Sequence, residues 1–84
     1  MPGNAVDLLY LRKRLECRVK FTDEERKKIN EIVSAIPDKV IRDIIFLRYF
    51  GRRSWRYISW VLGMASPDAY RMMLYRFWRD NGAA

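Results

Sequence analysis

The stretch that decides the fold is Ser54–Arg79, which reads SWRYISWVLGMASPDAYRMMLYRFWR. Ser54 offers a hydroxyl that can cap the start of a helix, and Gly63 offers the left-handed residue that commonly ends one. Ser66-Pro67-Asp68 repeats the start signal, with a hydroxyl cap, a proline at the first helical position and a carboxylate near the positive end of the helix. We therefore expect a short helix, a tight glycine turn and a longer helix that ends near Arg79.

The longer of these two helices has two faces of different character. Apolar side chains recur at spacings of three and four, which indicates a face that packs on the rest of the protein. These side chains are Tyr70, Met73, Leu74 and Phe77. The other face carries Asp68, Arg71, Met72, Tyr75 and Arg79. We expect the apolar face to pack on the rest of the protein and the other face to be exposed for contact with a partner.

Residues 1–35 predict two further helices. Asn4 can cap a helix from about Ala5 to Arg18, with ends uncertain by two to four residues. Its apolar stripe is formed by Leu8, Leu11, Leu15 and Val19. Thr22 and Glu25 have the three-residue spacing of a capping box, which predicts the start of a second helix. The core face of that helix is formed by Ile29, Ile32, Val33 and Ile36.

A central helix is expected between Pro37 and Gly51. Proline suits the first helical position because its missing amide hydrogen has no helical partner there. The segment is the most apolar of the chain, with Val40, Ile41, Ile44, Ile45 and Leu47. Gly51 offers the left-handed residue that would end this helix.

The pattern as a whole places the chain in the all-α class. No stretch shows the alternating, β-branched pattern of a strand. With 84 residues and 10.1 kDa, the chain can form one domain with a modest core. We expect a small bundle of about five helices in a single domain, 1–84. It would comprise N-terminal helices in 1–35, a helix-turn-helix unit in 36–80 and a frayed tail in 81–84.

The composition excludes several kinds of protein. The sequence has no histidine and one cysteine, so common metal ligands and the usual nucleophile–base pairs are missing. We therefore expect no enzyme and no cofactor. Cys17 cannot form an internal disulfide, which favours a cytoplasmic protein. Residues 1–4 do not start a secretion signal, and no apolar run approaches the roughly 20 residues of a membrane span, so we expect no membrane partner.

Positive charge is concentrated in the half that carries the quoted stretch. The chain has 17 Lys and Arg against 10 Asp and Glu, a formal charge of +7. From Ile44 to Ala84 there is no lysine, and the acids are Asp68 and Asp80. The seven arginines of this part, which give it +5, are Arg48, Arg52, Arg53, Arg56, Arg71, Arg76 and Arg79. Because arginine grips phosphate with a planar fork and stacks on aromatic rings, this charge favours a nucleic-acid partner.

A short helix, a glycine turn and a longer helix with a cationic face form the outline of a helix-turn-helix. Several short motifs carry a resemblance: Ile36-Pro37-Asp38, Leu47-Arg48-Tyr49-Phe50-Gly51, Ser54-Trp55, Ile58, Leu62-Gly63 and Ser66-Pro67. Over about Ile36 to Trp78, the chain resembles the region 4 helix-turn-helix of bacterial sigma factors. It resembles more closely the small sigma-like transcriptional regulators of phages and mobile elements.

This resemblance implies a DNA-binding protein whose helix 66–79 enters the major groove of double-stranded DNA. It implies that the residues facing base edges are Asp68, Ala69, Arg71, Met72 and Tyr75. We expect the DNA backbone to be contacted by Arg52, Arg53, Ser54, Arg56, Ser66, Arg76 and Arg79. One small reading head seldom binds tightly enough alone, so a homodimer or help from RNA polymerase is expected.

A second interpretation of the same surface stays open. Trp55 and Trp78 align with core positions, whereas Trp60 is less easily buried. With Tyr57 and Met64, Trp60 could form an exposed apolar patch, and such patches often mark a protein interface. The alternative is therefore a small basic interaction or inhibitor protein that binds RNA polymerase or a host nucleoprotein complex through its basic and aromatic surface.

Overall fold

The described part of the chain folds into helices. The computed structural model describes residues 5–17 and 19–83. Its elements are α1 (Ala5–Glu16), α2 (Asp23–Ser34), α3 (Lys39–Ile45), the π-helical η1 (Phe46–Phe50), α4 (Trp55–Leu62) and α5 (Pro67–Asp80). No strand occurs among these residues, so the expected all-α class is confirmed. None of the helices described here has both the length and the apolar character that crossing a membrane requires.

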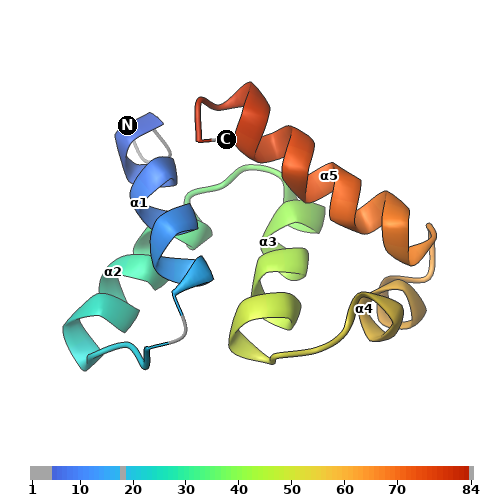
Figure 1. The fold of residues 1–84 in the computed structure, drawn as a ribbon, viewed down its shortest axis with the longest axis horizontal. Coiled ribbons are helices and arrows are strands. Elements are labelled where there is room, and N and C mark those ends of the chain that lie inside the picture. The colour runs from blue at the N-terminus through green and yellow to red at the C-terminus, as the bar shows by residue number, and fades with distance from the viewer. Residues whose placement is uncertain (1–4, 18, 84) are drawn as a thin grey trace.

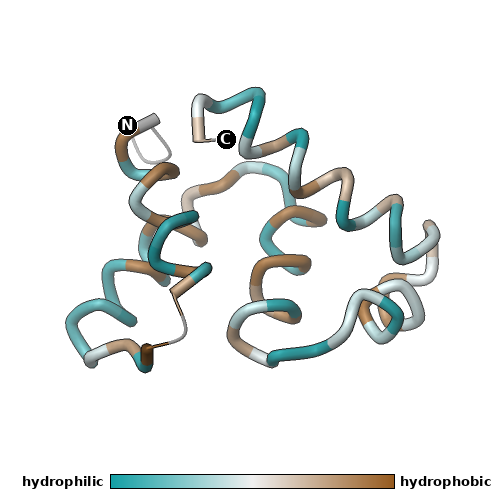
Figure 2. Tube along the Cα trace, in the orientation of Figure 1, coloured by the Kyte–Doolittle hydropathy of each residue, from teal (hydrophilic) through white to brown (hydrophobic). Residues whose placement is uncertain are grey.

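The helices are arranged around α3 (Figure 1). α1 and α2 lie on one side of it, and α4 lies on the other. α5 packs on α4 at its beginning, crosses α3 and reaches α1 at its end. Apolar stretches alternate with polar ones along the helices, as Figure 2 shows. All five α-helices contribute buried side chains to one core, among them Leu11, Ile29, Val33, Ile44, Ile58 and Leu74.

The helix starts follow the expected capping chemistry with one correction. Thr22 and Glu25 form the complete capping box, and Ser54 caps α4 as expected. Pro37, however, does not open α3. The carboxylate of Asp38 accepts hydrogen bonds from the backbone N–H groups of Val40 at 2.9 Å and Ile41 at 3.4 Å. Because Asp38 satisfies these otherwise unpaired donors, it is the cap, and α3 begins at Lys39.

The end of the central helical segment also differs from the expectation. Gly51 has φ −80°, whereas Arg52 has φ 51° and is the left-handed residue. The N–H of Arg53 donates to the carbonyl of Leu47 at 2.9 Å, which closes the turn one residue later than expected. A small residue suits position 51, because a Cβ there would lie 3.1 Å from the Leu47 carbonyl oxygen, which is a tight contact.

The first helix is shorter than expected. α1 ends at Glu16, and the N–H of Cys17 closes its last turn on the Arg14 carbonyl at 3.3 Å. Helical spacing no longer applies beyond that turn, so Val19 is 68% exposed and does not join the apolar stripe. The expected cap Asn4 and the expected helix end at Arg18 lie outside the described residues.

Asn81–Ala83, part of the segment expected to fray, form backbone hydrogen bonds with the last turn of α5. The N–H of Ala83 donates to the Trp78 carbonyl at 2.7 Å, and that of Gly82 donates to the Arg79 carbonyl at 3.3 Å. With Gly82 at φ 75°, these bonds form the Schellman motif that ends many helices. Ala83 is 1% exposed, and its carbonyl accepts a hydrogen bond from the Arg12 guanidinium.

An ion pair ties α1 to the start of α2. The Arg14 guanidinium donates to the carboxylate of Glu25 and also lies 5.0 Å from the centre of the Phe21 ring. The hydrogen bond from Arg14, followed by the backbone bond from Thr22, lowers the pKa of Glu25 from 4.5 to about 2. A carboxyl group with a lowered pKa stabilises the folded state above its ordinary pKa, and this contribution is lost as the pH falls.

We predict that Glu25→Gln lowers the melting temperature most at pH values above 4.5, and that its deficit disappears as the pH falls to about 2. Glutamine retains the capping-box hydrogen bond, so the substitution isolates the charge. Thermal unfolding followed by circular dichroism across this pH range measures the difference. A deficit that does not change with pH would contradict the prediction.

Candidate nucleic-acid interface

The junction between α4 and α5 is fixed by local hydrogen bonds. The Ser59 hydroxyl donates to the Ala65 carbonyl at 2.5 Å, and the Met64 N–H donates to the Tyr70 hydroxyl at 3.1 Å. Gly63 has φ 74°, the expected left-handed conformation at the end of α4. The hydroxyl of Ser66 accepts the Ala69 N–H at 3.1 Å and so caps α5, as expected. The two helices therefore have a defined mutual orientation.

The two faces of α5 separate largely as expected. Tyr70, Leu74 and Trp78 are buried, and Phe77 is half-buried against the same core. Met73 is a correction: it is 37% exposed, because it lies toward the edge of the buried face. Of the expected base-reading residues, the exposed ones are Asp68, Arg71, Met72 and Tyr75. Ala69 is half-buried on the flank of the helix.

Two of the exposed residues on α5 pair with each other. A guanidinium nitrogen of Arg71 lies 3.4 Å from a carboxylate oxygen of Asp68, one helical turn earlier. The side chains are 59% and 86% exposed, so water screens this pair and it contributes little to stability. Arg71 can exchange the Asp68 carboxylate for an external acceptor at small cost.

The loop before α4 presents arginines to solvent. Arg52 and Arg53 in this loop are exposed, as is Arg56 in the first turn of α4, and the guanidinium of Arg53 lies 4.8 Å from the centre of the Tyr57 ring. Arg48, half-buried beneath this loop, donates to the Arg53 carbonyl at 3.1 Å. It also lies 5.1 Å from the centre of the Trp55 ring. The rings of Tyr57 and Trp55 restrict the guanidinium groups of Arg53 and Arg48 without neutralising their charge.

The expected DNA-backbone residues fall into two groups. Ser54 and Ser66 cap the starts of α4 and α5, and Arg52, Arg53 and Arg56 lie next to Ser54 in the chain. Arg76 and Arg79 lie on the last turns of α5. Arg79 faces the exposed side of α5 and lies 3.2 Å from Asp80, whereas Arg76 lines a groove on the flank.

The apolar residues predicted as a protein interface are mostly exposed. Trp60 is 78% exposed and Met64 is 91% exposed. Tyr57 is half-buried, and its ring centre lies 6.0 Å from that of Trp60. Tyr57 and Trp60 lie on α4, and Met64 lies in the glycine turn that follows it. Together they form a surface beside the start of α5.

Two features of the surface are not predicted by the sequence. A groove of about 800 Å³ lies between the start of α3 and α5, lined in part by Val40, Met64 and Met73. Val40, in the most apolar segment of the chain, is 42% exposed, because it lies one residue from the buried Ile41 on the first turn of α3. A second, basic pocket lies between the α1–α2 linker and η1. Neither follows from helical spacing, because each combines residues from separate helices.

No metal centre is formed by the described residues: no three carboxylate or thiol side chains gather closely enough to hold an ion. Comparisons with protein-family models, with curated proteins and with solved structures find no match to this chain.

We predict that Gly63→Ala destabilises the fold by about 1 kcal/mol, because alanine is strained at positive φ although it also restricts the unfolded chain. A Cβ at this position meets no atom within 4 Å, so the penalty comes from the backbone. Gly63→Asn is the matched control and should cost less, because asparagine tolerates the left-handed conformation. Urea unfolding measures both; an alanine variant at least as stable as the parent would refute the expectation.

Proposed function

We propose that this protein is a DNA-binding helix-turn-helix protein, a transcriptional regulator of a phage or mobile element, with α5 in the major groove. The observation that carries the proposal is the exposed, cationic face of α5 beside a capped glycine turn. This face belongs to the half of the chain with +5 of the +7 charge. The resemblance to sigma factor region 4 over about Ile36 to Trp78 supports the same function.

The exposed face of α5 offers a short set of base contacts. The Arg71 fork fits the two acceptors on guanine, and Asp68 can accept a hydrogen bond from cytosine. Met72 and Tyr75, 39% and 47% exposed, offer apolar contact to a thymine methyl group. Because this set is small, phosphate contacts supply most of the affinity and bases supply a modest preference.

Phosphate contacts would come from the arginines around the start of α4 and on the last turns of α5, which are Arg52, Arg53, Arg56, Arg76 and Arg79. If about five cations contact phosphates, the slope of log affinity against log salt is near −4.5. A second copy of the chain on a two-part site, or RNA polymerase bound nearby, would raise the affinity to that of a specific regulator.

We predict that a mixed-sequence DNA duplex binds with an affinity that falls steeply with salt, and that Arg53→Ala plus Arg71→Ala weakens binding at least tenfold. Each substitution removes a cation that can form charge-assisted hydrogen bonds. Fluorescence anisotropy at two salt concentrations measures both effects.

The matched control for this experiment is Lys13→Ala plus Lys27→Ala, which removes the same charge from exposed positions on α1 and α2. It should weaken binding less, because these lysines lie outside the arginine-rich half. No binding at low salt by the folded protein would refute the proposed function, and equal losses in both variants would refute the placement of the interface.

The exposure of Trp60 and Met64 favours a second candidate function. A tryptophan that is 78% exposed beside a methionine that is 91% exposed leaves a large apolar area in water, as protein-binding surfaces do. The candidate is a small interaction or inhibitor protein that docks on RNA polymerase or a host nucleoprotein through this patch and the adjacent arginines.

Trp60→Ala separates the two functions. If the protein docks through the patch, the substitution abolishes capture of bacterial RNA polymerase in a pull-down and leaves the melting temperature nearly unchanged, because the side chain is exposed. If α5 alone carries the function, the same variant binds DNA with unchanged affinity. Loss of an exposed lysine in Lys27→Ala serves as the control for unspecific capture.

A further inference from the structure

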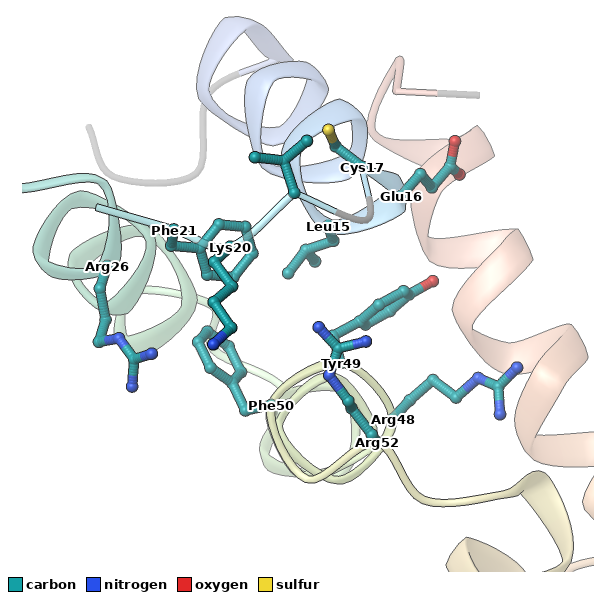
Figure 3. A pocket seen from close by; sticks show the side chains of 11 residues that line it. Leu15, Glu16, Cys17, Lys20, Phe21, Arg26, Arg48, Tyr49, Phe50 and Arg52 are labelled. Carbon is teal, nitrogen blue, oxygen red and sulfur yellow. The ribbon is translucent and has the colours of Figure 1, made fainter. Parts of the chain in front are cut away.

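A basic pocket lies between the two N-terminal helices and η1 (Figure 3). It has a volume of about 730 Å³ and lies between the α1–α2 linker, the first turn of α2 and η1. Lys20 and Arg26 line one side, and Arg48 and Arg52 line the other. Residues from separate elements thus bring the cationic side chains of Lys20, Arg26 and Arg52 to one pocket, whereas the Arg48 guanidinium is turned toward Arg53 and Trp55.

The positive charge of this pocket is poorly neutralised. The one carboxylate in its lining, that of Glu16, is bound by the Arg12 guanidinium at 2.9 Å. Within residues 5–17 and 19–83, no ion pair joins Lys20, Arg26 or Arg52 to an acid. Like charges directed toward one opening repel each other unless an anion lies between them. The lining therefore favours an anionic ligand.

The backbone at Arg52 adds a second observation. Arg52 is the one non-glycine residue with positive φ among the described residues, at 51°. This conformation costs about 1 to 2 kcal/mol for a residue with a side chain. The strained residue lines the pocket, and such strain clusters where a side chain is held for a ligand.

The rest of the lining supports a charged ligand without competing for it. Phe21 and Phe50 are half-buried, with ring centres 6.1 Å apart, and they limit the access of water to one wall. Burial raises the pKa of the Tyr49 phenol, so this side chain stays neutral. A wall of low polarity strengthens the attraction between the cations and an anion in the opening.

We propose that this pocket binds a phosphoryl group, held between Lys20 and Arg26 on one side and Arg52 on the other. Guanidinium groups form paired hydrogen bonds with phosphate oxygens, and an ammonium group adds a point charge. The phosphoryl group comes either from the backbone of a nucleic acid or from a free phosphorylated molecule. The proposal extends beyond the proposed function, because Lys20 and Arg26 belong to neither the base-reading set nor the backbone set.

The test is a titration of the ¹⁵N-labelled protein with inorganic phosphate, followed by NMR, with chloride exchanged to hold the ionic strength constant. We expect saturable shifts of the Lys20, Arg26 and Arg52 signals. In Lys20→Ala plus Arg26→Ala, phosphate should bind at least tenfold more weakly, because two cations are lost. Lys13→Ala plus Lys27→Ala removes the same charge elsewhere and should bind phosphate as the parent does.

A duplex-DNA arm identifies the source of the phosphoryl group. If Lys20→Ala plus Arg26→Ala weakens DNA binding and reduces the salt slope by about 0.9 for each lost contact, the group belongs to the nucleic-acid backbone. If phosphate saturates the pocket while DNA affinity is unchanged, the group belongs to a free molecule. Absence of saturable shifts at the three residues with both probes, or equal losses in the control variant, would overturn the proposal.

The outcome is independent of the function proposed for α5. Arg53→Ala plus Arg71→Ala should leave the phosphate titration unchanged, because neither residue lines the pocket. If this variant no longer binds DNA but phosphate still saturates the pocket, the result supports both proposals. If the parent protein binds DNA normally but phosphate does not bind the pocket, only the pocket proposal is refuted.

Discussion

The burial of one face of α5 is the constraint on which the rest of the structure depends. Tyr70, Leu74 and Trp78 enter the core on successive turns, and α5 contacts α1, α3 and α4 through this side. The Tyr70 hydroxyl also accepts the Met64 N–H, so the same buried ring holds the turn that precedes the helix. Because the buried face is fixed on several sides, the opposite face has a fixed direction, as a surface that binds a rigid partner requires.

Helix starts could be predicted from the sequence because their chemistry is local. Thr22, Ser54 and Ser66 each bond to a backbone group three residues away, and no distant residue is needed. The end of the α3–η1 segment could not be predicted in the same way. Gly51, the expected left-handed residue, has φ −80°, and the left-handed residue is Arg52, whose neighbour Arg53 bonds back to the Leu47 carbonyl. Which residue takes the left-handed conformation depends on packing, and the spacing of residues in the sequence does not reveal packing.

The candidate sites show the same division. Helical spacing separated the exposed Arg71 from the buried Leu74, and it identified Trp60 as an exposed residue. It did not identify the basic pocket, because Lys20 and Arg52 are far apart in the chain and meet only through the packing of η1 beside the α1–α2 linker. Charge on a short linker has no periodicity, so only the fold distinguishes a lining residue from a solvated one.

The hydrogen bond between Arg12 and Ala83 has a consequence for how the protein acquires its structure. It joins residues 71 positions apart, and the Schellman turn that presents the Ala83 carbonyl forms only after α5 is complete. Contacts between distant residues carry a large loop-closure cost and form late in folding. During synthesis on a ribosome, α1 can pack on α2 early, but it gains its contacts with the end of α5 only after residue 83 has left the exit tunnel.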